Sequence, residues 1–274
     1  MSMIRSSVTI SLVPEARGGP FVFWDDLENA CLTAKALNFD AVEIFAPNPE
    51  TLKSTSIKKA LADNGLALAA VGTGAGWVKH KLHLSLPNPA ERKKAMDFIK
   101  GMIDAGAAHQ APAIIGSMQG RHNEEVDKPS AIGYLSDALE ELGQYAEQHG
   151  VVLIFEPLNR FESNLINTME SGLHILDRLS TKNVKLLADL FHMNIEEVNI
   201  ADAIRQSGPR IGHVHFVDSN RRPAGNGHID LKLVSNALDE IQYQGYVSAE
   251  AMPWPDSESA AKTTIESFNR YFRN

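Results

Sequence analysis

The chain has 274 residues, 43% of them hydrophobic, and a formal net charge of -8. The length suits one large α/β domain, and the acidic balance disfavours nucleic acid or an anionic membrane as a partner. A lone cysteine, Cys31, excludes an intramolecular disulfide, and no apolar run approaches the roughly 20 residues of a membrane span. Because the first residues also lack the apolar run of a secretory signal, we expect a single domain over residues 1–274 in the cytoplasm.

Short apolar runs alternate with longer amphipathic stretches along the whole chain. The apolar runs predict strands near residues 4–12, 40–45, 66–72, 112–116, 151–156, 184–189, 211–217 and 246–250. The amphipathic stretches predict helices near residues 25–37, 50–64, 89–107, 130–149, 169–179, 195–207, 230–243 and 257–272. Eight strand–helix repeats predict an α/β fold of the (β/α)8 TIM barrel type, with an open doubly wound sheet as the alternative.

Local signals mark several of these boundaries. Asn88 suits the N-cap of the third predicted helix, because Pro89 follows it at the first helical position. Gly65 and Gly150 each follow a helical pattern and precede an apolar run, which is typical of glycines that end helices. The long segment 72–87 predicts an elaborated loop on the side of the barrel where active sites lie.

Two aromatic residues near this side are candidates for contact with a ligand. Trp77 lies in the long loop, where it could be a pocket or lid residue or a subunit contact. Phe45 ends the second predicted strand, and we expect it to pack in the core instead.

Four polar residues stand at the ends of four consecutive predicted strands. Glu156 follows VVLIF, Asp189 follows VKLLA, His215 lies in IGHVHFVDSN, and Glu250 follows YVSA. Adjacent strands lie about 4.8 Å apart, and the carboxyl ends of barrel strands surround the active site. We therefore expect these four side chains to converge above the barrel.

Three carboxylates directed at one another need a cation or a raised pKa. Three oxygen donors and one imidazole suit Mn²⁺, Mg²⁺, Co²⁺ or Zn²⁺, and the absence of cysteine from the set disfavours a structural zinc site. The alternative for any single residue is a carboxylate that caps the next helix or pairs with an arginine. Convergence of all four residues favours one divalent metal ion.

Two further histidines lie near this set. His213 is two residues before His215 on the same strand face, so we expect a hydrogen-bonded histidine deeper in the barrel. His192 lies one helical turn beyond Asp189, where it could contact a substrate oxygen atom or hydrogen-bond to the backbone.

The motifs EPLNRFE, ADLFHMNIEE and HVHFVDSNRRPAGNGHID resemble those of the xylose isomerase-like TIM-barrel superfamily, and within it most closely the ketose 3-epimerases of the D-tagatose and D-psicose 3-epimerase group. The resemblance implies that one divalent metal ion, most often Mn²⁺, is held by Glu156, Asp189, His215 and Glu250. It also implies that the two glutamates are the catalytic acid and base.

The same resemblance implies that Glu162, His192 and Arg221 contact the sugar, with Arg222 as a competitor for the role of Arg221. The implied reaction removes a proton from the carbon next to a ketone, passes through a metal-bound enediolate, and returns a proton to the opposite face. Members of this group are often oligomers, so we expect a homodimer or homotetramer. One departure is the loop IIGSMQGRHNEE, which lacks the aromatic residues that we associate with this position.

Other functions fit parts of the pattern. An aldose–ketose, hydroxypyruvate or inosose isomerase would use the same metal site and differ in the carbon that receives the proton. A metal-dependent hydrolase of abasic DNA needs additional histidine ligands and a basic groove, which the net charge of -8 disfavours. A sugar-binding protein without catalysis would not need both glutamates.

Overall fold

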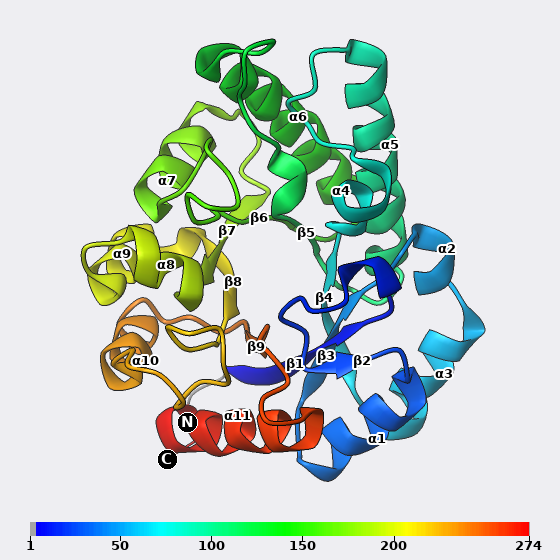
Figure 1. Ribbon diagram of the computed structural model, residues 1–274, viewed down its shortest axis with the longest axis vertical. Coiled ribbons are helices and arrows are strands. Elements are labelled where there is room, and N and C mark those ends of the chain that lie inside the picture. Colours follow the sequence, from blue (N-terminus) through cyan, green and yellow to red (C-terminus); the bar gives the residue numbers. More distant parts are fainter. Residues whose placement is uncertain (1–3, 274) are drawn as a thin grey trace.

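The structure is a computed structural model that describes residues 4–273. Its strands are β1 (Arg5–Ser11), β2 (Phe23–Trp24), β3 (Ala41–Phe45), β4 (Ala67–Gly72), β5 (Ala113–Ile115), β6 (Leu153–Phe155), β7 (Val184–Asp189), β8 (Ile211–His215) and β9 (Tyr246–Ala249). All strand pairs are parallel, and β1 also pairs with β9, which closes the sheet into a barrel (Figure 1). The two residues of β2 pair beside β1 and stand outside the eight-stranded ring.

Helices surround this barrel on its outer side (Figure 1). They are α1 (Leu27–Ala36), α2 (Pro49–Leu52), α3 (Thr55–Asn64), α4 (Ala75–His80), α5 (Pro89–Ala107), α6 (Lys128–Gln148), α7 (Met169–Arg178), α8 (Leu190–Glu196), α9 (Ile200–Ser207), α10 (Leu231–Glu240) and α11 (Ser257–Phe272). The predicted (β/α)8 TIM barrel is therefore confirmed, and the open sheet is wrong. None of the helices in the described part of the chain has the length and apolar character that crossing a bilayer requires.

Helix boundaries follow the capping signals in two of the predicted places. The Asn88 side chain accepts a hydrogen bond from the backbone N–H of Ala90 at 2.8 Å, which confirms it as the N-cap of α5. Gly65 ends α3 with a φ of 60°, a left-handed conformation that glycine adopts without the steric cost of a Cβ atom.

Other predicted boundaries are wrong. The helix predicted over 50–64 divides into α2 and α3, because the Ser54 side chain caps a new helix. The helix predicted over 195–207 divides into α8 and α9, and α8 begins already at residue 190. The cause is Asp189, whose carboxylate accepts hydrogen bonds from the backbone N–H groups of Phe191 and His192 and so starts the helix. The loop at 72–87 contains the short helix α4.

Strand alternation sorts the buried side chains into two layers. Most buried apolar residues pack between the strands and the surrounding helices. A small second cluster fills the barrel interior and consists of Ala70, Ile114, Ile154 and Leu187. Because successive side chains on a strand point to opposite faces, Glu156 and Asp189 are the next inward-facing residues after Ile154 and Leu187, toward the carboxyl ends of β6 and β7. The barrel interior therefore changes from this apolar cluster to charged side chains at its mouth.

Candidate metal and catalytic centre

The four polar residues predicted at strand ends meet at the mouth of the barrel. His215 Nδ1 lies 3.0 Å from Asp189 Oδ2 and 3.4 Å from both Glu156 Oε1 and Glu250 Oε2. One potential ligand atom from each residue lies within 4.8 Å of all the others. We call Glu156, Asp189, His215 and Glu250 the quartet. Their roles as metal ligands and catalytic bases stay predictions, and their convergence is a feature of the structure.

The two-residue period of the strands explains this convergence. Ile154 points into the barrel, and Glu156 follows it by two residues, just beyond the end of β6. The same period directs Asp189, at the end of β7, and His215, at the end of β8, inward. Glu250 directly follows β9. Four adjacent strands thus each deliver one polar side chain to the same level of the barrel.

Arg221 pairs with two of the three quartet carboxylates. The guanidinium of Arg221 donates from Nη1 to Asp189 Oδ2 at 2.5 Å, and from Nη2 to Glu250 Oε2. The third carboxylate is different, because Glu156 Oε1 is buried and has no hydrogen-bond partner among the described residues. A buried carboxylate oxygen without a partner is costly unless a cation or a bound ligand satisfies it.

Burial and neighbouring charges shift the pKa values of three quartet members. Burial raises the pKa of Glu250 to about 8, against the opposing effect of His215 and Arg221. Burial alone would raise the pKa of Asp189, but the charge of Arg221 holds it well below the usual value. Burial would lower the pKa of His215, but the carboxylates of Glu250 and Glu43 raise it well above the usual value. His215 thus lies in a strongly cation-attracting environment.

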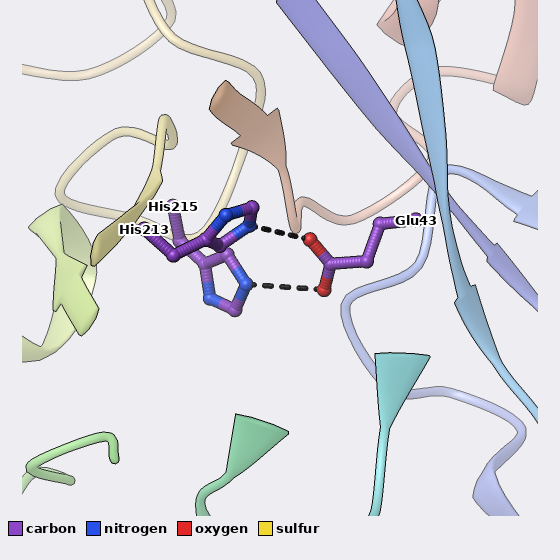
Figure 2. Close-up of side chains that lie close together, drawn as sticks. All are labelled: Glu43, His213 and His215. Atoms are coloured by element: carbon purple, nitrogen blue, oxygen red, sulfur yellow. Dashed lines mark hydrogen bonds and ion pairs between the residues drawn. The ribbon is translucent and has the colours of Figure 1, made fainter. Parts of the chain in front are cut away.

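Glu43 is a site residue that the sequence reasoning missed. It comes from the middle of β3, and its carboxylate meets two histidines of β8 inside the barrel (Figure 2). Glu43 Oε2 lies 2.8 Å from His213 Nε2, and Glu43 Oε1 lies 3.2 Å from His215 Nε2. The signal in the sequence was the charged residue within the apolar run AVEIF, since a buried carboxylate requires a partner. The prediction for His213, a hydrogen-bonded interior histidine, is confirmed.

The Glu43 contact fixes which side of His215 faces the quartet. A carboxylate can only accept, so His215 Nε2 carries the hydrogen atom that it donates to Glu43. The other ring nitrogen, Nδ1, then points to the quartet carboxylates with its lone pair available in the neutral ring. A carboxylate behind a ligating imidazole is a common device for orienting the ring toward a metal ion.

The three predicted sugar-contacting residues lie beside the quartet. His192 is on α8 and buried, with Nε2 at 3.8 Å from Glu156 Oε1. Its Nδ1 lies 2.7 Å from Asn159 Nδ2, so it hydrogen-bonds to a side chain as well as lying near the backbone N–H of Asn159. Glu162 is half exposed and accepts from Asn159 Nδ2 at 3.0 Å. One asparagine therefore links these two predicted contacts.

The loop after β8 decides between the two arginines. Asp218 accepts hydrogen bonds from the backbone N–H groups of Gly225 and Ile229, and its backbone carbonyl accepts from Arg221 N–H. Within this fixed loop Arg221 has a φ of 62°, an uncommon left-handed conformation for a non-glycine residue, and its side chain enters the quartet. Arg222 points elsewhere, with its guanidinium carbon 4.1 Å from the ring centre of Trp254.

A cavity of about 420 Å³ opens above the quartet. Glu156, Glu250, His192, Arg221 and Glu162 all line it, together with an aromatic wall of Phe21, Phe45, Trp77 and Phe161. Its volume falls within the range of about 300–1,000 Å³ that is typical of small-molecule sites.

The expectation that Phe45 packs in the core is wrong. Phe45 stacks on Phe21 at 4.7 Å and faces the cavity, because it is the last residue of β3. Trp77 takes the predicted pocket position.

The donor set fits a divalent cation. Three carboxylates and one imidazole nitrogen surround one small volume, and one buried carboxylate oxygen there has no partner. Oxygen and imidazole donors suit Mn²⁺, Mg²⁺ or Co²⁺. A structural zinc ion is less suited to this set, because it usually has cysteine ligands. Glu43, His213 and His215 form a second compact group, but its hydrogen bonds already pair the charges.

The fold is a TIM barrel, and its last four strands place a compact cluster of three carboxylates and one imidazole at their carboxyl ends. The sequence profile of one family, described as xylose isomerase-like TIM barrel, matches residues 31–271. The chain belongs to this family.

Named relatives narrow the comparison. The chain is 33% identical over 221 residues to the D-psicose 3-epimerase of Agrobacterium fabrum. The aligned region covers 78% of this chain and 75% of that protein. The chain is 30% identical over 229 residues to the 3-dehydro-D-guloside 4-epimerase of Escherichia coli, covering 79% and 83%. A crystal structure of D-psicose 3-epimerase with D-tagatose from Clostridium cellulolyticum aligns with a TM-score of 0.81 at 25% identity, over 98% of this chain and 99% of that chain.

Proposed function

We propose that this protein is a metal-dependent sugar epimerase of the ketose 3-epimerase type, which inverts a carbon next to a ketone. The observation that carries the proposal is the placement of two glutamates from separate strands on one cavity. Glu156 Oε1 and Glu250 Oε2 each lie 3.4 Å from His215 Nδ1, and both line the cavity that would receive the sugar. The names of both relatives describe inversion at a carbon beside a ketone.

Each glutamate would serve one face of the reacting carbon. One removes the proton, and the other returns a proton to the opposite face, so that the centre is inverted. Glu156 and Glu250 enter the cavity after β6 and β9, with β7 and β8 between them, and so can approach a bound sugar from different directions. Their roles would exchange with the direction of the reaction.

The quartet would hold the metal ion, with Mn²⁺ as the foremost candidate and Mg²⁺, Co²⁺ or Zn²⁺ as alternatives. When bound, a divalent cation supplies Lewis-acid charge that stabilises negative charge on a substrate oxygen. Arg221 and His192 would hold further oxygen atoms of the sugar and add positive character beside the reacting carbon. Glu162, at the cavity edge, would accept a hydrogen bond from a sugar hydroxyl.

The remaining proposals concern the protein as a whole. We propose that residues 1–274 act as one domain, because β1 closes the barrel against β9 near the other end of the chain. We propose a cytoplasmic homodimer or homotetramer, in line with the lone, buried cysteine and the family resemblance.

A substrate panel tests the function. D-fructose, D-allulose, D-tagatose, L-ribulose, hydroxypyruvate and an inosose are incubated with the Mn²⁺-loaded protein in deuterated water and followed by NMR. We expect an epimerised ketose with deuterium at the inverted carbon. An aldose product, or exchange restricted to the terminal carbon beside the ketone, would instead establish an isomerase. The absence of both turnover and exchange with every compound would exclude the proposed function.

A further inference from the structure

A second compartment adjoins the cavity above the quartet. This compartment has a volume of about 350 Å³, close to that of the first. The two share four lining residues, namely Trp77, Ser117, Arg121 and Glu162. We call the first the reaction compartment and the second the side compartment. Trp77 and Glu162 thus lie at the boundary between two spaces of similar size.

The backbone next to the shared residue Ser117 lies very close to Glu156. Gly116 directly precedes Ser117, and a Cβ atom at Gly116 would lie 2.4 Å from Glu156 Oε2. Only glycine allows the chain to run this close to the glutamate without displacing it. The loop IIGSMQGRHNEE, which departs from the expected family pattern, thus forms the edge of the reaction compartment and much of the wall of the side compartment.

Several uncharged polar side chains line the side compartment. Its lining adds His83, Gly120, His122, Asn123 and Asn164 to the four shared residues. Among residues 4–273, no hydrogen bond engages His83 Nε2, the His122 imidazole or Asn123 Nδ2. These groups offer both donors and acceptors, and imidazoles and amides are suited to recognising hydroxyl groups.

The charges of the side compartment do not favour an anionic group. Arg121 donates to the backbone carbonyls of Phe161 at 3.1 Å and Glu162 at 2.7 Å, so its guanidinium already has partners. The Glu162 carboxylate lies in the same lining and balances its charge. Burial lowers the pKa of His83 to about 4, which keeps this imidazole neutral near pH 7. A phosphate or carboxylate would meet little free positive charge here.

We propose that the side compartment binds a second polyhydroxylated ring, joined by a glycosidic bond to the keto sugar that reacts. The preferred substrate class is then a two-ring keto sugar, and a free ketose fills only the reaction compartment. This inference rests on the proposed epimerase function, because it specifies the substrate of the same site. Binding energy from the second ring would raise kcat/KM for the reaction at the quartet.

Matched substrate pairs test the inference with the Mn²⁺-loaded protein. D-fructose is compared with its glucosyl derivatives maltulose, leucrose and isomaltulose, and methyl 3-ketoglucoside is compared with 3-ketocellobiose. Deuterium exchange and epimer formation are followed by NMR. We expect kcat/KM of at least one two-ring compound to exceed that of its one-ring partner by about tenfold or more. If exchange occurs but no two-ring compound exceeds its partner, the inference is wrong and the epimerase function stands.

Variants of the side compartment test whether the preference for two-ring compounds arises there. His83→Ala and His122→Ala are expected to lower the two-ring to one-ring ratio of kcat/KM by about tenfold, because each removes a hydroxyl-binding group. His174→Ala is the matched control, since His174 is exposed on α7, away from both compartments. Circular dichroism checks that each variant is folded. A ratio unchanged in both folded variants would overturn the assignment of the side compartment.

Discussion

Two buried groups of carboxylates and histidines lie next to each other in this barrel and differ in how their charges are balanced. In the lower group, Glu43 spans His213 and His215, and both of its oxygens have a partner (Figure 2). In the upper group, the quartet, Glu156 Oε1 has no hydrogen-bond partner among residues 4–273. The carboxylate oxygens of the lower group are therefore all paired within the protein, whereas the upper group leaves one that a bound cation or ligand would satisfy.

The largest expected effect tests the upper group. Glu156→Gln and Glu250→Gln each replace a carboxylate with a near-isosteric amide that cannot transfer a proton as a base. We expect each to lower kcat for ketose epimerisation by about 10³-fold. Glu147→Gln, on the exposed face of α6, is the control and should leave kcat within about twofold. Near wild-type kcat in either site variant would remove the two-base scheme.

Two neighbouring arginines in the loop after β8, Arg221 and Arg222, allow a residue of the site to be compared with one outside it. Arg221 contacts two quartet carboxylates at once, which a lysine cannot reproduce with a single ammonium group. We expect Arg221→Lys to lower kcat/KM by about 10²-fold. Arg222→Lys changes a contact with Trp254 outside the cavity and should cost little. Steady-state kinetics on one ketose compares them, and equal losses would contradict the assignment of Arg221.

We expect Glu43, in the lower group, to affect metal binding by the quartet through its contact with His215. Glu43→Gln keeps an oxygen acceptor but removes the charge that orients His215. We expect the Kd for Mn²⁺, measured by isothermal titration calorimetry, to rise by about 10–100-fold. The folded state is checked by circular dichroism, and Glu147→Gln again serves as the control. An unchanged Kd in folded Glu43→Gln would show that Glu43 has a packing role alone.

Much of the barrel and of the quartet could be predicted from the sequence, because both depend on local patterns. Alternating apolar and amphipathic segments predict the eight units, and polar residues directly after apolar runs mark Glu156, Asp189 and Glu250. Glu43 escaped because its role depends on contacts with β8, 170 residues away along the chain. Phe45 escaped because nothing in its own segment shows that the neighbouring volume is open. A charge within the apolar run AVEIF signals that Glu43 needs a partner, but short-range patterns identify neither that partner nor the position of a cavity.

The partly buried His83 extends the comparison and gives the smallest effect. His83 has no carboxylate partner among the described residues, and burial lowers its pKa to about 4. The unfolded chain binds this proton near pH 6.5, so between about pH 6.5 and 4 the unfolded state holds more protons and acidification favours unfolding. The full shift would remove about 2 kcal/mol of stability between pH 7.5 and 5, and solvent screening of the partly exposed ring reduces the expected loss to about 1 kcal/mol, or about 2–4 °C in Tm.

Thermal unfolding at these two pH values, in wild type and His83→Ala, measures this effect. The drop in Tm on acidification should be smaller in His83→Ala than in wild type, and His174→Ala should behave like wild type. An equal drop in all three proteins would show that His83 is not the group that responds.

The proposed function requires one cation in the quartet, and metal binding can be measured without any substrate. Chelator-treated wild-type protein is titrated with Mn²⁺ by calorimetry, beside Asp189→Asn, His215→Gln and the control Glu147→Gln. The prediction is one Mn²⁺ per chain in wild type and control, with affinity reduced by at least about 10²-fold in both quartet variants. A wild-type protein that binds no divalent cation, or quartet variants that bind it as tightly as wild type, would contradict the central claim.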